Sequence, residues 1–315
     1  MTVQPDGPGP DHLLAQVNQR LSELVPATLP GHEALDRAMR DSMLGPGKRL
    51  RPIVAVMIAT ELGGSAAAAL DAGCAVEMAH AASLVLDDLP CMDDAVLRRG
   101  QPALHRAHGE DVALLASIGL LSEAYALLAR LRDVDPRQRG ECVAVLAEAV
   151  GSLGLVAGQF QDLRSPAGGR PLSEVSQTNG LKTGSLFRAA VELGAIAARA
   201  DGASRESLRR FADEIGLAFQ LLDDLLDGAA SPLVTGKDVG KDHNKSTIVS
   251  MIGPAQVERR IDRHFEAAHR HLDAVFGPGS RLGAVMDETF GRPARRETAE
   301  RAVTARALEQ EAGAR

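Results

Sequence analysis

The sequence predicts an all-α protein, and its composition, its periodicity and its lack of strand patterns support that prediction. Of the 315 residues, 45% are hydrophobic, mostly Ala and Leu, whereas aromatic residues make up 3%. Ala and Leu favour helices, while sheets favour β-branched and aromatic side chains. No convincing alternation of polar and apolar residues is found, and no linker divides the chain. We therefore expect one helical domain over residues 11–290.

The first helices are delimited by Pro and Gly. Residues 1–10 (MTVQPDGPGP) are rich in both and are expected to be disordered. From Asp11 the apolar residues recur three and four positions apart, which predicts a helix with one buried face. The helical pattern breaks at 26–31, resumes over Glu33–Met43, breaks at Gly45-Pro46-Gly47 and resumes over Pro52–Leu62.

A long apolar stretch, Ala66–Leu86, contains one breaker, Gly73, and predicts a buried helix that runs directly into the acidic segment 87–94. Further helices are expected over five segments: 111–131, 140–163, 172–199, 204–226 and 255–276. The segments 165–171 and 228–245 are expected to be irregular. The pattern after Gly291 predicts neither order nor disorder for residues 291–315.

Charge and cysteine content exclude several classes of protein. The formal net charge of −7 argues against a general nucleic-acid binder, which normally carries a basic face. Three widely spaced cysteines suit a reducing compartment and no disulfide framework. No apolar run reaches bilayer length and no signal pattern begins the chain, so we expect a cytoplasmic protein without an integral membrane segment.

The first acidic cluster, LDDLPCMDD (86–94), places four carboxylates at the end of the apolar helix. Carboxylates at a helix C-terminus face the negative end of the helix dipole, so some compensating charge is expected. Because Pro90 interrupts the helix, Asp87 and Asp93 could be brought to one side, where a divalent cation could bind them. A solvated helix end is the alternative.

The second acidic cluster is FQLLDDLLD (219–227), in which Asp223 and Asp227 are four residues apart and share one helix face. Oxygen ligands without His or thiolate partners indicate a hard cation, and Mg²⁺ is favoured over Zn²⁺. Mg²⁺ usually takes one or two carboxylates and fills its other positions with water and phosphate oxygens. The two clusters together suggest a diphosphate held between them by metal ions.

Basic residues adjoin breaks or acidic clusters at several places. They are Lys48, Arg49 and Arg51 after the Gly-Pro-Gly break, Arg98 and Arg99 after the first acidic cluster, Lys182 in mid-chain, and Lys237, Lys241 and Lys245 near the second cluster. Arg offers forked donors to phosphate and Lys a point charge. For any one of these groups a solvated face is the alternative, and His80 alone could be an ordinary structural histidine.

Seven motifs, in order, give the chain a resemblance to a known family. They are GPGKRLRP (45–52), HAASLVLDDLPCMDD (80–94), LRRGQPALH (97–105), GQFQDL (158–163), KTGSLF (182–187), FQLLDDLLD (219–227) and GKDVGKDHNKST (236–247). Together they resemble the trans-prenyltransferase family of farnesyl and geranylgeranyl diphosphate synthases, and bacterial carotenoid-pathway geranylgeranyl diphosphate synthases in particular. The resemblance implies an antiparallel helical bundle of the isoprenoid synthase type with a central cavity, assembled as a homodimer.

The resemblance also implies roles for individual residues. Isopentenyl diphosphate would be held by Lys48, Arg51, His80 and Arg99. The allylic substrate would be contacted by Arg98, Lys182, Gln220 and Lys237, with Thr183 close to the reacting carbons. Mg²⁺ would be bound by Asp87 and Asp93 on one side and by Asp223 on the other, with Asp88 and Asp227 in support. The cations would neutralise the departing diphosphate, and electrostatic stabilisation of that leaving group would be the main catalytic term.

Two rival functions differ in sequence features. A terpene cyclase shares the Asp-rich motif but needs no second diphosphate site, and its cavity is typically aromatic. A non-catalytic metal-binding helical protein would have no reason to pair both aspartate clusters with basic loops.

Product length is expected to depend on Ala82 and Ser83, five and four residues before Asp87. If Asp87 binds metal at the top of the cavity, these side chains line the tunnel into which the product grows. Both are small, which predicts geranylgeranyl diphosphate as the main product and farnesyl diphosphate as the second candidate. The alternative is that both are ordinary small residues at a helix contact.

Overall fold

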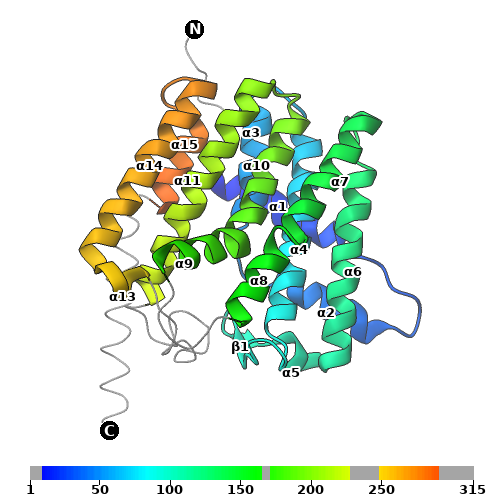
Figure 1. Ribbon diagram of the computed structural model, residues 1–315. Helices are drawn as coiled ribbons and strands as arrows, with labels where there is room; N and C mark the ends of the chain where they lie inside the picture. Colours follow the sequence, from blue (N-terminus) through cyan, green and yellow to red (C-terminus); the bar gives the residue numbers. More distant parts are fainter. Residues whose placement is uncertain (1–8, 165–170, 228–247, 291–315) are drawn as a thin grey trace.

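The computed structural model describes residues 9–164, 171–227 and 248–290, which form a bundle of helices with one short hairpin (Figure 1). The elements are α1 (Pro10–Leu24), α2 (Glu33–Leu44), α3 (Leu50–Glu61), α4 (Ala66–Asp87), β1 (Leu97–Arg98), β2 (Gln101–Pro102), α5 (Leu104–His108), α6 (Glu110–Ala129), α7 (Pro136–Val150), α8 (Leu155–Leu163), α9 (Leu172–Asn179), the π-helical turn η1 (Gly180–Gly184), α10 (Ser185–Ala197), α11 (Gly202–Asp227), α13 (Ile248–Ile252), α14 (Pro254–Phe276) and α15 (Arg281–Phe290). The all-α prediction is confirmed. Residues 1–8 and 291–315, and most of both segments expected to be irregular, lie outside the described residues.

The structure differs from the predicted elements in three ways. The helix expected over 140–163 is two helices, α7 and α8, because the chain turns so tightly at Gly154 that a Cβ there would lie 2.2 Å from the Ala149 carbonyl oxygen. The helix expected over 172–199 contains the π-helical turn η1. Sequence reasoning also missed the β1–β2 hairpin and the helices α5, α13 and α15.

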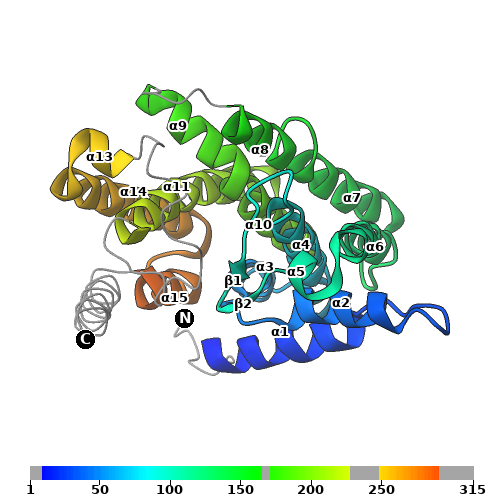
Figure 2. The same cartoon turned by 90° about the horizontal axis from the view of Figure 1, so that it is seen from below.

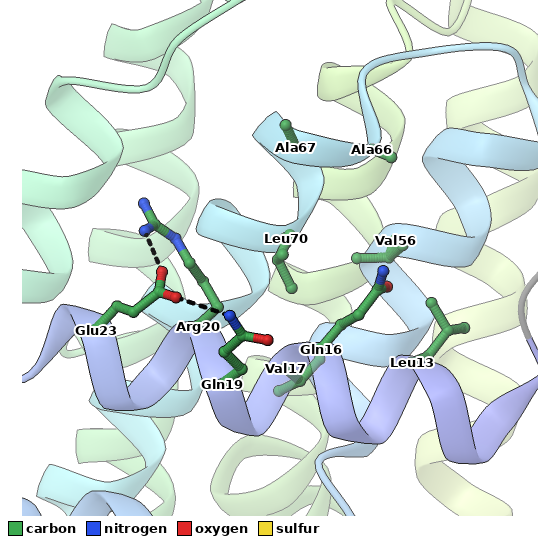
Figure 3. Close-up of a pocket in the computed structure, with 10 residues that line it drawn as sticks. All are labelled: Leu13, Gln16, Val17, Gln19, Arg20, Glu23, Val56, Ala66, Ala67 and Leu70. Carbon is green, nitrogen blue, oxygen red and sulfur yellow. Dashed lines mark hydrogen bonds and ion pairs between the residues drawn. The ribbon is translucent and has the colours of Figure 1, made fainter.

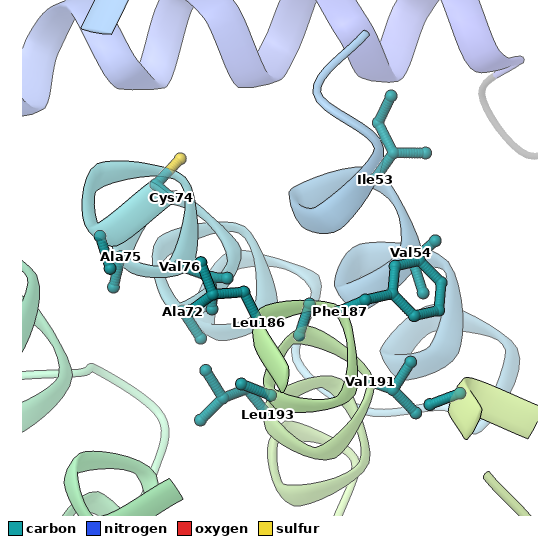
Figure 4. Close-up of a cluster of buried hydrophobic side chains, with 14 of the residues drawn as sticks. Ile53, Val54, Ala72, Cys74, Ala75, Val76, Leu186, Phe187, Val191 and Leu193 are labelled. Carbon is teal, nitrogen blue, oxygen red and sulfur yellow. The ribbon is translucent and has the colours of Figure 1, made fainter. Parts of the chain in front are cut away.

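Helix α4 occupies the middle of the bundle, where it packs against α3, α6 and α10 (Figure 2). It is apolar on nearly every side, so burial rather than an amphipathic stripe determines its position. Figure 4 shows Val54 of α3, Val76 of α4, and Leu186, Phe187 and Val191 of α10 in one buried cluster. The helix expected from the apolar stretch is therefore the core of the fold.

Small residues allow α3 to lie very close to its two neighbours. A Cβ on Gly73 of α4 would lie 2.5 Å from the Cα of Pro52, and a Cβ on Gly194 of α10 would lie 2.6 Å from the carbonyl oxygen of Ala55. Since such contacts are shorter than any real side chain can make, glycine is required at both positions. The three helices are thus held in one fixed register, which in turn fixes the position of the acidic end of α4.

The expectation that no apolar run is long enough to cross a membrane is wrong on length and composition. Three segments meet both criteria, namely Ala66–Asp87, Glu110–Ala129 and Pro136–Leu163. The apolar character of the first segment is accounted for by its place in the core, because 67% of its most apolar window is buried inside the molecule. The apolar windows of the other two segments are only 39% and 22% buried, so much of their apolar surface faces outward.

Chain direction brings the ends of α4 and α11 to the same end of the bundle. Ser65, just before α4, donates its N–H to the carbonyl oxygen of Ala197 at the end of α10, 3.3 Å away. Helix α11 begins at Gly202, shortly after the same point. Both helices therefore start beside the end of α10 and, with 22 and 26 residues, extend roughly 33 and 39 Å at 1.5 Å per residue. Their aspartate clusters lie at the end where α10 begins.

Candidate active site

The first aspartate cluster folds back on itself just after α4. Asp87 is the last residue of the helix and Asp88 its C-cap. Pro90 interrupts the helix, and the chain returns so that Asp93 N–H donates to the Asp87 carbonyl at 2.9 Å and Ala95 N–H to the Asp88 carbonyl at 3.2 Å. This turn places Asp93 next to Asp87, which a continuous helix would not do.

Asp87 is a buried carboxyl, 8% exposed, whose charge is poorly compensated by the protein. Burial raises its pKa to about 6; the neighbouring carboxylates of Asp93 and Asp88 raise it as well, while Lys182 and Arg98 lower it. Because burial and like charges both oppose ionisation, the ionised form needs further positive charge. A divalent cation bound by Asp87 and Asp93 would supply it, so the donor set and its surroundings fit Mg²⁺.

Asp88 turns toward the hairpin instead. Its carboxylate, buried like that of Asp87, accepts from Arg98 Nε, which lies 3.0 Å from each of its oxygens, and also from Nη2. Arg99 and Gly100 form the two-residue turn between β1 and β2, and both have positive φ (51° and 77°), as a type I′ turn requires. The turn directs Arg99 away from Arg98, and Arg99 Nη1 donates to the Pro46 carbonyl at 2.6 Å.

A second group of cations lies around the start of α3. It comprises Lys48, Arg49, Arg51 and Arg99, of which Arg49 is buried and Lys48 exposed. Burial lowers the pKa of both Arg51 and Arg99, and each guanidinium is also influenced by the nearby Glu77 carboxylate. Lys48 Nζ lies 5.6 Å above the centre of the Phe290 ring. Several guanidinium groups held this close together would attract an anion with several charges.

His80 lies in α4 beside this group, two turns before Asp87. Burial lowers its pKa well below the usual 6.5, and Arg51, Arg99, Arg98 and Arg49 lower it further. The imidazole is therefore neutral at pH 7 and can take part as a hydrogen-bonding group rather than as a cation. Its place among the four arginines means that any anion they bind is within its neighbourhood.

Lys182 and Thr183 lie in the π-helical turn η1, and Thr183 is half-buried. Lys182 Nζ donates to Asp162 Oδ2 of α8 at 3.1 Å. The two segments are close because Gly158 has no side chain; a Cβ there would lie 2.5 Å from the Lys182 backbone nitrogen. The next residue, Gln159, is buried, and neither of its side-chain polar atoms has a hydrogen-bond partner in residues 9–164, 171–227 and 248–290.

The second aspartate cluster is described only in part. Its helix, α11, is placed, and Gln220 is half-buried on it, but the side chains of Asp223 and Asp227 and all of Lys237 lie outside the described residues. Within the described ranges, no three His, Cys, Asp or Glu residues are grouped so that they alone could hold a metal ion. The carboxylates after α4 would thus need ligands from elsewhere, such as α11 or a phosphate.

Ala82 and Ser83 are both buried on α4, within two turns of Asp87. Ser83 Oγ donates to the His80 carbonyl oxygen at 2.9 Å, so its hydroxyl is turned back along its own helix. Neither side chain would present a bulky group along this part of α4.

Sequence reasoning gave no role to Glu77, Gln159 or Asp162, all of which lie among these residues. Glu77 is bonded to Arg49, and Asp162 to Lys182. A carboxylate within the apolar stretch of α4 was the available signal for Glu77. For the other two, the motif GQFQDL was noticed, but nothing in its spacing shows which side chains turn inward.

A cavity of about 330 Å³ lies elsewhere, between α1, α3 and the start of α4 (Figure 3). Its walls are mostly apolar, and its charged residues neutralise one another, since Arg20 is paired with both Asp71 and Glu23. Ala66 and Ala67, which line it, are some 20 residues before Asp87, or about 30 Å along α4 at 1.5 Å per residue. This cavity is therefore separate from the aspartate and arginine clusters.

Comparison with known proteins gives consistent results. The model of the polyprenyl synthetase family matches residues 32–269. The geranylgeranyl diphosphate synthase of Pantoea ananas is 44% identical over 267 residues, which cover 84% of this chain and 87% of that protein. The farnesyl diphosphate synthase of Geobacillus stearothermophilus is 37% identical over 268 residues, covering 84% and 90%.

Solved structures show the same fold. The apo structure of an FPP/GFPP synthase from Zymomonas mobilis superposes with a TM-score of 0.80 at 31% identity, covering 91% of this chain and 97% of that one. The expectation of an isoprenoid synthase type of helical bundle is thereby confirmed.

Replacing Asp87 by Asn is expected to stabilise the metal-free protein at pH 7.5. The pKa of Asp87 in the folded state, about 6, lies above its usual 3.8, so stability is lost as the pH rises from about 4 through about 6. Above that range the ionised carboxyl costs on the order of 2 kcal/mol, which Asn removes, and the Tm should rise by about 4 °C. Thermal unfolding in EDTA would measure this, and the difference should shrink toward zero near pH 4. A lower Tm for the variant at pH 7.5 would contradict the pKa argument.

Proposed function

Because the chain belongs to the polyprenyl synthetase family, we propose that it joins isopentenyl diphosphate to an allylic diphosphate and makes mainly geranylgeranyl diphosphate. The observation that carries this proposal is the presence of two charged sites along α4. One surrounds Asp87 and includes Lys182 and Arg98; the other surrounds His80 and includes Arg51 and Arg99. Asp87 follows His80 by seven positions, about 10 Å along the helix, which allows two diphosphates to bind side by side.

The allylic diphosphate is assigned to the site around Asp87. Asp87 and Asp93 would hold Mg²⁺ together with Asp223 and Asp227 of α11, and Mg²⁺ when bound supplies positive charge to the departing diphosphate. Lys182 and Arg98 add fixed positive charge beside it, and Lys237 is assigned the same role. Asp88 holds Arg98 in position through their ion pair.

Isopentenyl diphosphate is assigned to the site around His80. Lys48, Arg51 and Arg99 would neutralise its charge, and the neutral His80 would add a hydrogen bond. No metal is needed there, because the guanidinium groups are numerous and partly buried, where their attraction for an anion is less screened by water.

The reaction proposed is cleavage of the allylic carbon–oxygen bond, attack of the isopentenyl double bond on the allylic carbon, and loss of a proton to the released diphosphate. Charge moves onto the diphosphate as its bond to carbon breaks, so the cations around Asp87 lower the barrier. Thr183 and Gln220 are assigned to the allylic side, near the reacting carbons. The allylic carbon becomes positively charged as its bond to oxygen breaks, and water must be kept away from it. The apolar helices around the site exclude water.

Twenty carbons are proposed for the main product because Ala82 and Ser83 are small and buried near Asp87. The identity to the Pantoea ananas geranylgeranyl diphosphate synthase supports the same choice. Farnesyl diphosphate is the second candidate, favoured by the similarity to the Geobacillus stearothermophilus enzyme.

A homodimer is part of the proposal, as is a cytoplasmic location. The outer faces of α6 and α8 expose large apolar side chains, among them Leu115 (55%), Ile118 (55%) and Phe160 (63%). Exposed apolar surface of this extent marks an interaction site in soluble proteins. Two copies that pair through these faces would cover it, which explains the poorly buried apolar windows noted above.

Loss of a metal-binding aspartate should nearly abolish turnover. Asp93→Ala and Asp223→Ala are each expected to reduce kcat at least a hundredfold, equivalent to about 3 kcal/mol of stabilisation of the leaving group. Turnover of labelled isopentenyl diphosphate with an allylic primer and Mg²⁺ would measure this. Glu266→Ala, which removes an exposed carboxylate on α14, is the control and should be unaffected. Near-normal turnover by Asp223→Ala would contradict the metal assignment.

Product length should respond to Ala82. Ala82→Phe is expected to shorten the main product from twenty to fifteen carbons, because the ring would fill the space into which the chain grows. Mass analysis of dephosphorylated products would show the change, and Ala81→Phe, on the neighbouring face of α4, is the control for crowding of the helix. A wild type that stops at fifteen carbons, or an Ala82→Phe variant that still makes twenty, would contradict the tunnel assignment.

Assembly should depend on the outer face of α6. Wild-type protein is expected to sediment as a dimer and Ile118→Glu as a monomer, because a charge in the centre of an apolar interface opposes pairing. Leu29→Glu changes an apolar residue that is even more exposed, at 70%, in the α1–α2 loop and should leave the dimer intact. Analytical ultracentrifugation distinguishes these outcomes, and a monomeric wild type at micromolar concentration would refute the proposal.

A further inference from the structure

Glu77 is a buried carboxylate in the middle of α4, one turn before His80. Its exposed fraction is 3%, and it lies within an otherwise apolar part of the helix. Oε1 accepts a hydrogen bond from Arg49 Nη1 at 2.9 Å, whereas Oε2 is buried and has no hydrogen-bond partner among the described residues. A buried carboxylate oxygen left unpaired is costly, so its retention calls for an explanation.

Arg49 joins Glu77 to three other parts of the chain. Nε donates to Asn18 Oδ1 of α1 at 3.1 Å, and Nη2 donates to the carbonyl oxygens of Met43 and Gly45 at 2.8 and 2.6 Å. All three nitrogens of the guanidinium are thus bound to protein groups. Arg49 is therefore a structural member of the arginine cluster, and Glu77 is the carboxylate that balances its charge.

The loop that Arg49 holds also carries the contact to Arg99. Arg99 Nη1 donates to the Pro46 carbonyl, and a Cβ on Gly47 would lie 2.9 Å from the same nitrogen and 3.3 Å from Arg49 Nη1. The position of the 45–47 loop therefore determines where the Arg99 guanidinium lies. Glu77 is thus linked to Arg99 through Arg49 and the 45–47 loop.

Arg51 is the second group that depends on Glu77. Its Nε is buried, and no residue that the structure describes accepts a hydrogen bond from it. Burial and the positive charge of Arg99 both disfavour the Arg51 guanidinium, while the Glu77 carboxylate favours it. Among the described residues, Glu77 is thus the carboxylate whose negative charge offsets the unfavourable burial of the charged Arg51 guanidinium.

We propose that Glu77 is the positioning residue of the isopentenyl diphosphate site. It holds Arg49, and with it the 45–47 loop, through their hydrogen bond, and its negative charge attracts the Arg51 guanidinium, so that Arg51 and Arg99 meet the diphosphate in one fixed arrangement. The inference rests on the proposed function, because it takes the arginine cluster as the place where isopentenyl diphosphate binds.

The test is Glu77→Gln, which keeps the shape of the side chain and removes its charge. The KM for isopentenyl diphosphate is expected to rise about tenfold or more, since hydrogen bonds to charged groups stabilise by about 1.5–3 kcal/mol. The KM for the allylic substrate and kcat should change by less than about twofold, because the Asp87 site is not involved. Loss of a merely structural contact would not separate the two KM values in this way.

Glu192→Gln is the matched control. Glu192 of α10 is also buried, and its Oε1 accepts from Arg205 Nε at 2.7 Å and Arg209 Nη2 at 2.9 Å. Its Oε2, like that of Glu77, has no partner among the residues described. It shares the chemistry of Glu77 but pairs with different arginines. This control should lower the Tm without raising the KM for isopentenyl diphosphate.

Two further variants separate the possible failures. If Glu77→Gln does not fold, Arg49→Lys takes its place, since it retains the charge but not the fork of donors, and should raise the same KM.

Arg51→Gln tests the site itself. If Arg51→Gln raises the KM for isopentenyl diphosphate and the Glu77 and Arg49 variants do not, or if they raise both KM values equally, the role of Glu77 is refuted and the site stands. If Arg51→Gln has no effect on that KM, the proposed site is refuted as well.

Discussion

Burial of ionised groups along α4 is the constraint on which the rest of the structure depends. The helix is apolar enough to form the centre of the bundle, yet it carries Glu77 within it and Asp87 and Asp88 at its end. Each of these carboxylates needs positive charge nearby, because ionised groups are costly to bury alone. Glu77 has Arg49 and Asp88 has Arg98. The positive charge near Asp87 balances its carboxylate only in part. This shortage of positive charge makes its surroundings suitable for a metal ion.

Each cation reaches α4 from a different element, and each needs a local backbone device. Arg49 and Arg99 lie at positions with positive φ, one at the start of α3 and the other in the turn of the hairpin. Lys182 comes from a π-helical turn that approaches α8 closely where Gly158 leaves room. Conformations of this kind are unfavourable for ordinary side chains, so their concentration here is consistent with a functional site. The apolar remainder of the bundle keeps these segments in place.

Much of the fold was predictable because helix boundaries follow Pro, Gly and apolar spacing. The buried helix expected over Ala66–Leu86 ends one residue later, at Asp87. The errors arose where tertiary contacts decide. Nothing in the periodicity of 140–163 shows that Gly151 and Gly154 permit a tight turn between α7 and α8. The membrane expectation failed for a related reason: an apolar helix that is buried in a core or paired with another copy has the same composition as one that spans a bilayer.

The sequence by itself determined the all-α class, the acidic end of the central helix and the family of enzymes, because these depend on residue types at fixed spacing. Only the tertiary structure decided which charges meet. In the sequence, Arg49 and Arg51 are equivalent basic residues two positions apart. In the fold, Arg49 is bound on every side and neutralised by Glu77, whereas the Nε of Arg51 is unpaired within the described part of the chain. Asp87 and Asp88 differ in the same way, since one faces Asp93 and the other Arg98. Such differences depend on the direction of each side chain among helices far apart in the chain, and no local pattern records that direction.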